Sequence, residues 1–396
     1  MSDETKASAT VSDYLRWRGD LTFAQDGFNE VDNLLLCIIS YIKLENIPRL
    51  RSFDPQDAMP MGDVCRLLTE EDEQLGLSTL DYIPLMRQAA GTPRFREVSL
   101  FAFESLHDED RQMQFAAVSF LLPDGSVYAA YRGTDMTIVG WQEDFNMSFL
   151  SAVPAQVKAA EYAGAVARAC PRRALRIGGH SKGGNLAAWA AVHLDEKLQR
   201  QRLIAAYNND GPGFSRDLVD TPSYQAVADR LFTYIPASSI VGVLLEHAED
   251  YEVVDSTARS IMQHEPLSWC VEGPRFVHLG QRSQLGQLSD GVLREWIGSM
   301  SPQEREQFSR AFFDILSRGG RTKTLEDLRS GGLAAGAALI REYAGADEEK
   351  KKIISEIFRR LAVDVKDELV KAAGAGVRRA GESILATGQA IADLRK

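Results

Sequence analysis

The stretch Gly178 to Ala187, which reads GGHSKGGNLA, has the residue types and spacing that a nucleophilic serine requires. It follows a short apolar run at 174–177 and precedes an alanine-rich run at 186–194, so we predict a strand, a sharp turn and a helix. Glycines two residues before and after Ser181 remove side chains that would collide in so tight a turn. The pattern therefore predicts that the Ser181 hydroxyl stands above a sheet edge, beside the free N–H groups of a helix N-terminus.

A serine nucleophile needs a base, which we expect among the histidines that follow it in the chain. These are His193, His247, His264 and His278. We predict His264, because Pro266 stops regular structure and leaves this imidazole on a late loop. His247 is the alternative, although its surroundings also suit a helix end. His193 is expected about three helical turns beyond Ser181 and so to point away from it.

The acid that would orient the base is the least determined member of the group. Asp210 follows a predicted strand at 203–207, which places it at the same sheet edge as Ser181. We predict Asp210 as the acid, although an Asp-Gly pair is also a common turn. The open alternatives are Glu246, Asp250, Asp255, or a dyad assisted by Ser239.

Two backbone N–H groups are expected to hold the oxyanion of the reaction. One is that of Lys182, directly after the serine. The other is that of Thr134, in a polar turn that follows a predicted strand at 127–131. A turn of this composition is also typical of an ordinary loop, so Thr134 depends on the rest of the site.

Alternating strands and helices are predicted to position these residues. The expected strands are 114–122, 127–131, 174–178, 203–207, 231–235 and 251–254, and the expected helices are 155–169 and 183–198. Such alternation favours a mainly parallel sheet covered on both faces, with the first hairpin as an antiparallel addition. A further apolar helix at 34–42 is expected to pack in the core.

Several motifs together resemble the class 3 lipases. They are Arg132-Gly133-Thr134 after an apolar strand, Trp141 and Asp144, and the Gly-His-Ser-x-Gly-Gly stretch. The chain is more closely similar to a bacterial family of lipase-like α/β-hydrolases of unknown function, of which the GHSKGGNLA stretch is a mark. Further marks stand at 14–20, 28–33, 209–214, 238–242 and 263–269.

This resemblance covers roughly residues 13–280 and implies a three-layer α/β/α hydrolase fold with a mainly parallel sheet and a Ser-His-Asp triad. It implies no particular substrate. The sequence departs from the lipase pattern at the acid, because the Asp-Ile-Val segment of class 3 lipases reads Ser239-Ile240-Val241 here. A serine cannot hold an imidazolium electrostatically, which leaves the acid in doubt.

Composition narrows the classes of protein to which the chain can belong. It has 396 residues, 44% apolar and 26% charged, with a formal net charge of −11. The negative charge argues against a nucleic-acid partner. We find no signal peptide pattern and no apolar stretch near the ~20 residues that span a bilayer. The four cysteines lie far apart, so neither a zinc site nor a disulfide framework is expected. A cytoplasmic location is the expectation.

The chain is predicted to hold a polar disordered segment at 1–12, an α/β-hydrolase domain at 13–285 and a helical extension at 286–396. In the extension, apolar residues recur at helical spacing around 354–372 and 377–394. The opposite face carries many basic residues with acidic ones interleaved. We expect this extension to pack on protein or to self-associate rather than to make peripheral membrane contact.

The sequence thus predicts a serine hydrolase that acts on a small-molecule or lipid ester through an acyl-enzyme on Ser181, with no metal or organic cofactor. A hydrolase-fold protein without turnover, acting as a lipid-binding or protein-interaction module, is the alternative. A membrane-surface scaffold dependent on the helical extension is a third.

Overall fold

The computed structural model describes most of the chain up to Arg318. The described residues are 8–69, 82–134, 138–147, 150, 152–239, 241–283 and 300–318, with positions 348, 351, 352 and 355. The chain divides into two compact units, of which one comprises Met1–Asp135 and Pro154–Ser283 and the other Met136–Val153 and Gln284–Lys396. Every site residue predicted from the sequence belongs to the first unit.

A nine-stranded sheet forms the centre of the first unit, in the order β1-β2-β3-β4-β5-β6-β7-β8-β11. Its strands are β1 (Met59–Pro60), β2 (Ser99–Asp108), β3 (Met113–Leu121), β4 (Val127–Tyr131), β5 (Leu175–His180), β6 (Leu203–Asn209), β7 (Leu231–Pro236), β8 (Tyr251–Val254) and β11 (His278–Leu279). Neighbours from β4 to β8 are parallel, whereas the other pairs are antiparallel. Two further strands, β9 (Val271–Glu272) and β10 (Arg275–Phe276), form a separate hairpin.

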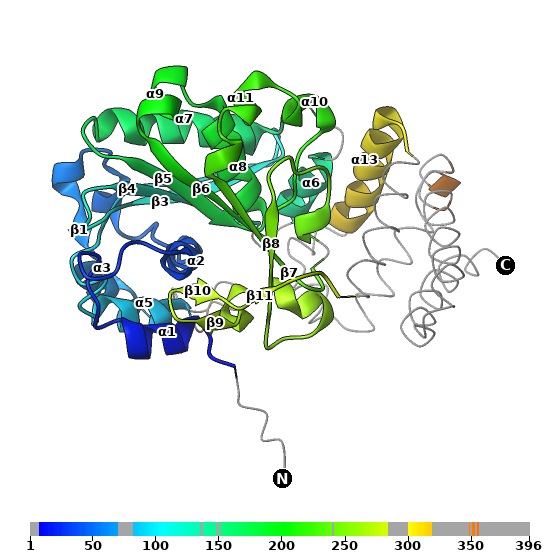
Figure 1. Ribbon diagram of the computed structural model, residues 1–396. Helices are drawn as coiled ribbons and strands as arrows, with labels where there is room; N and C mark the ends of the chain where they lie inside the picture. The colour runs from blue at the N-terminus through cyan, green and yellow to red at the C-terminus, as the bar shows by residue number, and fades with distance from the viewer. Residues whose placement is uncertain are drawn as a thin grey trace, which may run out of the picture. The chain divides into compact units, whose positions relative to one another are not determined.

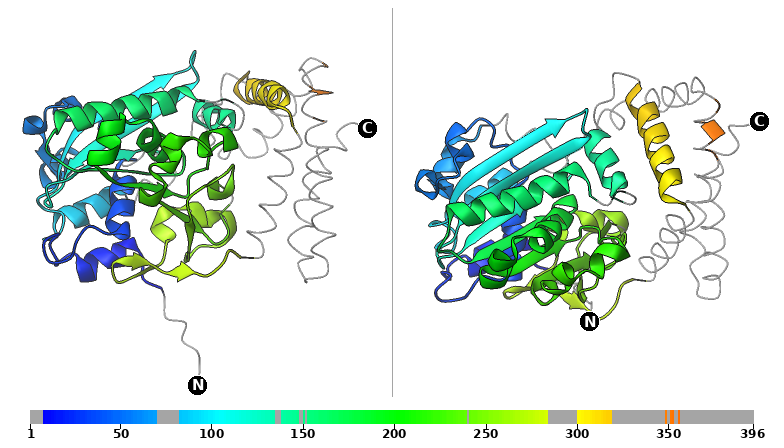
Figure 2. Two further views of the ribbon diagram at one scale, coloured as in Figure 1. Left: turned by 45° about the horizontal axis from the view of Figure 1, so that its top comes forward. Right: turned by 90° about the horizontal axis from the view of Figure 1, so that it is seen from above.

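Helices cover both faces of this sheet, which gives three layers (Figure 1; Figure 2). α7 (Pro154–Ala169) and α8 (Lys182–His193) lie on one face, and α2 (Glu30–Ile39) and α5 (Tyr82–Ala90) on the other. On β4, Tyr128 contacts Asn33 of α2 whereas Tyr131 contacts Ala159 of α7, because residues of opposite parity face opposite sides of a strand. The predicted three-layer α/β/α hydrolase fold is confirmed.

Shorter helical segments complete the first unit. They are α1 (Val11–Arg18), α3 (Met61–Leu67), α9 (Glu196–Gln201), α10 (Arg216–Val219), α11 (Pro222–Gln225), η1 (Pro48–Arg51), η2 (Pro55–Asp57), η4 (Ala228–Arg230), η5 (Val241–Val243), η6 (Ser260–His264) and η7 (Pro266–Ser268). Of these, η5 and η6 carry backbone and side-chain groups of the candidate active site.

All six predicted strands exist, and β4 and β8 have the predicted limits. No strand is predicted from the sequence over the residues of β2. The alternation of β2 is broken by a bulge between Phe101 and Glu104, where Ala102 has φ 53°. A bulge shifts the side-chain period, so strand patterning fails at this edge of the sheet.

The helix after Ser181 is shorter than predicted. It ends at His193 rather than at 198, because Leu194 is extended and Asp195 begins a second helix, α9. The Asp195 carboxylate accepts hydrogen bonds from the N–H groups of Lys197 and Leu198. An aspartate that caps a new helix N-terminus is thus what separates α8 from α9.

The N-terminal segment is more ordered than predicted. α1 begins at Val11, which is fully buried, and Thr10 with Asp13 forms a capping box at its start. Val11 and Ser12 therefore belong to a helix rather than to the disordered segment that we expected at 1–12. Residues 1–7 of that segment lie outside the described residues.

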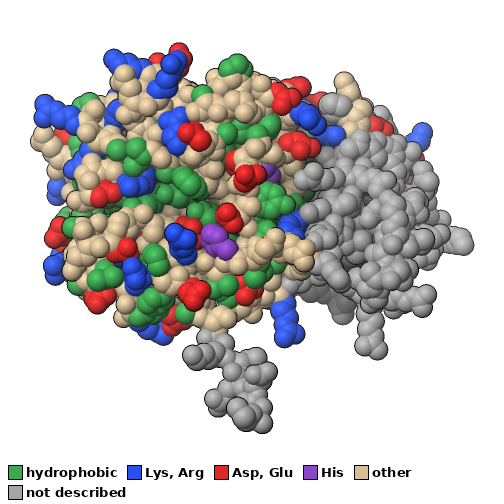
Figure 3. All heavy atoms as spheres, viewed as in Figure 1, with side chains coloured by type: hydrophobic (Ala, Val, Ile, Leu, Met, Phe, Trp, Pro, Cys, Tyr) green, Lys and Arg blue, Asp and Glu red, His purple; other side chains and the backbone are tan. Residues whose placement is uncertain are grey.

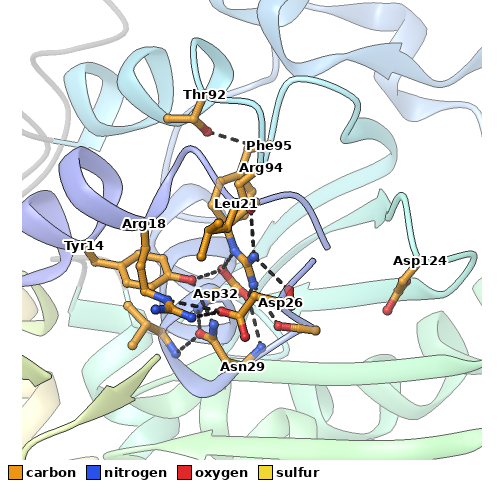
Figure 4. A network of polar contacts seen from close by, with 12 residues as sticks. Tyr14, Arg18, Leu21, Asp26, Asn29, Asp32, Thr92, Arg94, Phe95 and Asp124 are labelled. Atoms are coloured by element: carbon orange, nitrogen blue, oxygen red, sulfur yellow. Dashed lines mark hydrogen bonds and ion pairs between the residues drawn. The ribbon is translucent and has the colours of Figure 1, made fainter. Parts of the chain in front are cut away.

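A buried ion pair explains the motifs at 14–20 and 28–33 (Figure 4). Arg94 and Asp32 face each other with fully buried side chains. The guanidinium also donates to the carbonyls of Leu21, Asp26 and Gly27, and the Tyr14 hydroxyl donates to Asp32 Oδ1 at 2.8 Å. Every charged group here has partners, so the cluster fastens α1 and α2 to the loop before β2.

The second unit is described only in part. α6 (Ile138–Asn146) packs on α13 (Pro302–Arg318), with the rings of Phe145 and Phe308 at 5.3 Å. Ser309 Oγ donates to Asn146 Oδ1 at 2.8 Å. α13 lies within the predicted helical extension, whereas the predicted helices at 354–372 and 377–394 lie outside the described residues apart from Ser355. The domain limits given above stay a prediction.

The face of the molecule in Figure 3 carries acidic and basic side chains side by side, with small apolar patches between them. Exposed apolar side chains include Ile204 on β6 and Phe232 on β7, 43% and 42% exposed. The Phe232 ring stacks on that of Tyr207 at 5.4 Å. Scattered apolar residues of this kind are ordinary on a protein surface and indicate no site.

Candidate active site

Ser181 lies in the sharp turn between β5 and α8, with the left-handed φ of 58° that few non-glycine residues adopt. A Cβ on Gly179 would come within 2.1 Å of the Gly183 backbone, and one on Gly183 within 2.2 Å of the Tyr131 carbonyl oxygen. Glycine is therefore required at both positions by direct steric contact, as the sequence spacing suggested.

His264, the last residue of η6, faces Ser181. Its Nε2 lies 3.0 Å from Ser181 Oγ, and its side chain is 30% exposed. Since only Glu265 separates η6 from Pro266 and η7, the imidazole is held on a short irregular segment at the carboxyl edge of the sheet.

Asp210 follows β6, the strand next to that of the serine, and its side chain is fully buried. Its Oδ2 lies 2.6 Å from His264 Nδ1. Its Oδ1 accepts the Gly242 N–H at 3.1 Å. The structure thus brings Asp210, His264 and Ser181 into one continuous chain of hydrogen bonds.

These contacts determine which imidazole nitrogen carries the proton. A carboxylate can only accept, so His264 Nδ1 holds the N–H that points at Asp210. In the neutral ring Nε2 then presents its lone pair to the Ser181 hydroxyl. A group so arranged can take a proton from the serine while the carboxylate stabilises the resulting imidazolium.

The other histidines after the serine have partners elsewhere. His247 pairs with Glu249, His193 stacks on Trp189 at 3.9 Å, and His278 lies between Glu30 and Glu252. Among the described residues, the His264 ring nitrogens make their hydrogen bonds with Asp210 and Ser181, and not with Glu246, Asp250, Asp255 or Ser239.

The loop that carries Asp210 is tied to the helix that follows Ser181. Asn185 Nδ2 donates to the carbonyls of Pro212 and Gly213 at 3.1 and 3.0 Å, and Gln156 donates to Asn185 Oδ1 at 2.7 Å. A Cβ on Gly211 would lie 2.3 Å from the Ser181 carbonyl oxygen. No role is predicted from the sequence for Asn185 and Gln156. Each is a polar residue on a helix face that is otherwise apolar, and that contrast could have identified it.

A second set of contacts holds the backbone at His264. His180 Nε2 donates to the His264 carbonyl at 2.8 Å, and Tyr41 Oη lies 3.0 Å from His180 Nδ1. Burial and the neighbouring His264 hold the pKa of His180 well below its usual range, so this ring stays neutral. The indole N–H of Trp269 donates to the Gln263 carbonyl at 3.0 Å.

The prediction of an apolar core helix did not include the polar contacts that Tyr41 and its neighbours make. The helix is buried as expected, but Asn33 and Cys37 on α2 and Tyr41 just after it recur every four residues and form a polar row toward the sheet. Asn33 donates to Asn209 Oδ1 at 2.8 Å, at the end of β6. That spacing is the signal that could have identified Tyr41.

The two predicted oxyanion residues flank the serine. Lys182 is the first residue of α8, and its Nζ donates to the Gln114 carbonyl at 2.9 Å and to Gln114 Oε1 at 2.7 Å. Thr134 follows Gly133, where a Cβ would lie 3.1 Å from Ser181 Cβ. Both backbone segments therefore lie against Ser181, and the role of their N–H groups stays a prediction.

The described residues contain no cluster of three or more His, Cys, Asp or Glu residues that suits a metal ion. Within them, no helix is long and apolar enough to cross a bilayer. The four cysteines are all buried and unpaired.

A family model described as Mbeg1-like matches residues 89–314, more than half of the chain. The match includes Ser181, Asp210 and His264 and leaves out the N-terminal helices. No curated protein matches the sequence.

The structure is also similar to those of solved lipases. Rhizomucor miehei lipase in a propeptide complex has 16% identity and a TM-score of 0.33, over 44% of this chain and 72% of that one. Lip2 lipase from Yarrowia lipolytica has 15% identity and a TM-score of 0.33, over 54% and 80%. M37 lipase has 17% identity and a TM-score of 0.33, over 53% and 68%. At such identities the likeness concerns the fold alone.

Proposed function

The chain belongs to the Mbeg1-like family, and on this premise we propose that it is a serine hydrolase that cleaves an ester bond through an acyl-enzyme. The observation that carries the proposal is the pair of distances on either side of one imidazole. His264 lies 3.0 Å from Ser181 Oγ and 2.6 Å from Asp210 Oδ2. These two contacts, in a lipase-like fold, support nucleophilic catalysis by Ser181.

In the proposed reaction Ser181 Oγ attacks the ester carbonyl carbon while His264 Nε2 takes the hydroxyl proton. The bond to the alcohol then breaks as His264 returns that proton to the leaving oxygen. Water attacks the acyl-enzyme in the same way and releases the acid. Asp210 keeps the imidazole in the required tautomer and stabilises its positive charge.

The tetrahedral oxyanion would be held by backbone N–H groups of Lys182 and Thr134. Lys182 lies at the N-terminus of α8, where helix N–H groups lack partners within the helix. The proposal needs no metal or organic cofactor. A small-molecule or lipid ester is the proposed substrate class, and a cytoplasmic location is proposed with it.

A fluorophosphonate probe tests the proposal without knowledge of the substrate. We expect one labelled residue, Ser181, in the folded wild-type protein. Ser181→Ala should abolish labelling and lower ester turnover on the order of 10⁶-fold, or to background. Ser215→Ala is the matched control, because Ser215 is exposed and its side chain makes no capping hydrogen bond.

Labelling of Ser215→Ala should equal that of the wild type. Folded wild-type protein that several fluorophosphonates leave unlabelled would contradict the proposal and favour a hydrolase-fold binding module instead.

A further inference from the structure

A second histidine–carboxylate pair lies beside the Ser181 site and connects to it through one glycine. His247 Nδ1 lies 3.1 Å from Glu249 Oε1, and His247 Nε2 lies 2.8 Å from the Gly242 carbonyl oxygen. The Gly242 N–H in turn donates to Asp210 Oδ1. The His247 and Glu249 side chains are 5% and 2% exposed. Contacts therefore run without a gap from Glu249 to Asp210.

Gly242 is the residue that joins the His247 contact to the Asp210 contact. A Cβ there would lie 2.3 Å from Asp210 Oδ1 and 3.1 Å from the Ile235 side chain, so no larger residue fits. Glycine leaves the two peptides around it freer to rotate than any other residue does. One of these peptides supplies the N–H to Asp210 and the other the carbonyl to His247. The His247 hydrogen bond thus restrains the orientation of the peptide that follows Gly242.

The partners of Glu249 explain why His247 can hold that carbonyl. Burial alone raises the pKa of Glu249, but hydrogen bonds from His247, Thr233 and Tyr224 and the charge of His247 lower it overall. The carboxylate is therefore ionised and accepts from Tyr224 Oη at 2.6 Å and from Thr233 Oγ1 at 2.5 Å. The carboxylate and the Gly242 carbonyl both only accept, so each contact requires a proton on the His247 nitrogen that makes it.

We propose that His247 and Glu249 are positioning residues for the reaction on Ser181, which hold the Gly242 peptides so that the Gly242 N–H keeps the Asp210 carboxylate aligned with His264. Asp210 needs such support because its own backbone has a left-handed φ of 55°. The His247–Glu249 pair contributes little to the free energy of unfolding, because the cost of burying two charges offsets most of the attraction between them. This inference rests on the proposed function.

A double-mutant cycle separates positioning through Asp210 from a general structural role. We expect His247→Leu to lower kcat for p-nitrophenyl acetate about tenfold with little change in KM, because small displacements of a catalytic group slow the chemical step. In an Asp210→Asn background the same change should lower kcat less than about twofold, because coupled residues are not additive. His247→Gln, whose amide can still donate to Gly242, should recover most of the activity.

His278→Leu is the matched control, because His278 also lies between carboxylates but contacts none of the three residues of the site. It should leave kcat unchanged. An equal loss from His247→Leu in both backgrounds would overturn the inference, as would unchanged kcat in a folded His247→Leu protein. If His247→Leu does not fold, His247→Gln and His247→Asn take its place, and only the former should retain activity. Wild-type protein without turnover or labelling would overturn both this inference and the proposed function.

Discussion

Two histidine–carboxylate pairs that meet at Gly242, His264–Asp210 and His247–Glu249, both join an imidazole to a buried carboxylate and differ in what the second imidazole nitrogen meets. Nε2 of His264 meets the Ser181 hydroxyl, which can give up a proton. Nε2 of His247 meets a carbonyl, which can only accept one. The first ring can therefore act as a base, whereas the second is confined to donating. The pair itself does not make a catalytic site; the third partner does.

The two pairs also differ in how far their histidine side chains are exposed to solvent. The His264 side chain is 30% exposed, whereas that of His247 is 5% exposed. A catalytic base must reach both substrate and water, while a buried pair can only act on its neighbours.

The largest expected effect is the loss of the base. His264→Ala should lower the rate of fluorophosphonate labelling and of ester turnover on the order of 10⁶-fold, because Ser181 then has no proton acceptor. Labelling kinetics followed by mass spectrometry measure this. His193→Ala is the control, since the His193 ring stacks on Trp189 and its Nδ1 lies 2.9 Å from the Trp189 carbonyl oxygen. A loss of similar size in both variants would show that His264 has no special role.

The next effect concerns the glycine between the pairs. Gly242→Ala should lower kcat about 100-fold, because the new Cβ displaces the Asp210 carboxylate by an ångström or so. Gly280→Ala is a matched control, because a Cβ there would contact nothing within 4 Å. Steady-state kinetics with a thermal unfolding curve for each variant measure the effect. Full activity in Gly242→Ala would mean that Asp210 need not be held by this backbone.

The smallest effect concerns stability and pH. His247→Leu should lower the free energy of unfolding at pH 7 by about 2 kcal/mol, because a charged hydrogen bond to buried Glu249 is lost. The pKa of Glu249 is lowered in the folded wild type, so His247 stabilises the fold above the unfolded pKa of glutamate and less as pH falls. The difference between wild type and variant should therefore narrow as the pH falls below about 4.3, the unfolded pKa of glutamate.

Urea unfolding at pH 5, 4 and 3 measures this difference, with His278→Leu as the control at each pH. A difference that widens as the pH falls would contradict the lowered pKa of Glu249.

Local pattern was enough to predict much of the fold. The strands from β4 to β8 follow from apolar runs bounded by turn residues, and the turn at Ser181 follows from the glycines around it, because both depend on residues close in sequence. Three errors have local causes that the pattern hides: the bulge in β2, the new helix that Asp195 begins, and the capping of α1 by Thr10.

By itself the sequence determined that Ser181 stands on a tight turn at the end of a strand, since glycine spacing and apolar periodicity are local properties. Only the tertiary structure decided which acid and which histidine meet there. Asp210, His247 and His264 all follow strands or precede turns in similar ways, and 83 residues separate His264 from Ser181. Which acid and histidine meet Ser181 depends on which strands are neighbours and on how η5 and η6 fold over the sheet edge. Contacts between residues so far apart in the chain leave no periodic pattern in the sequence.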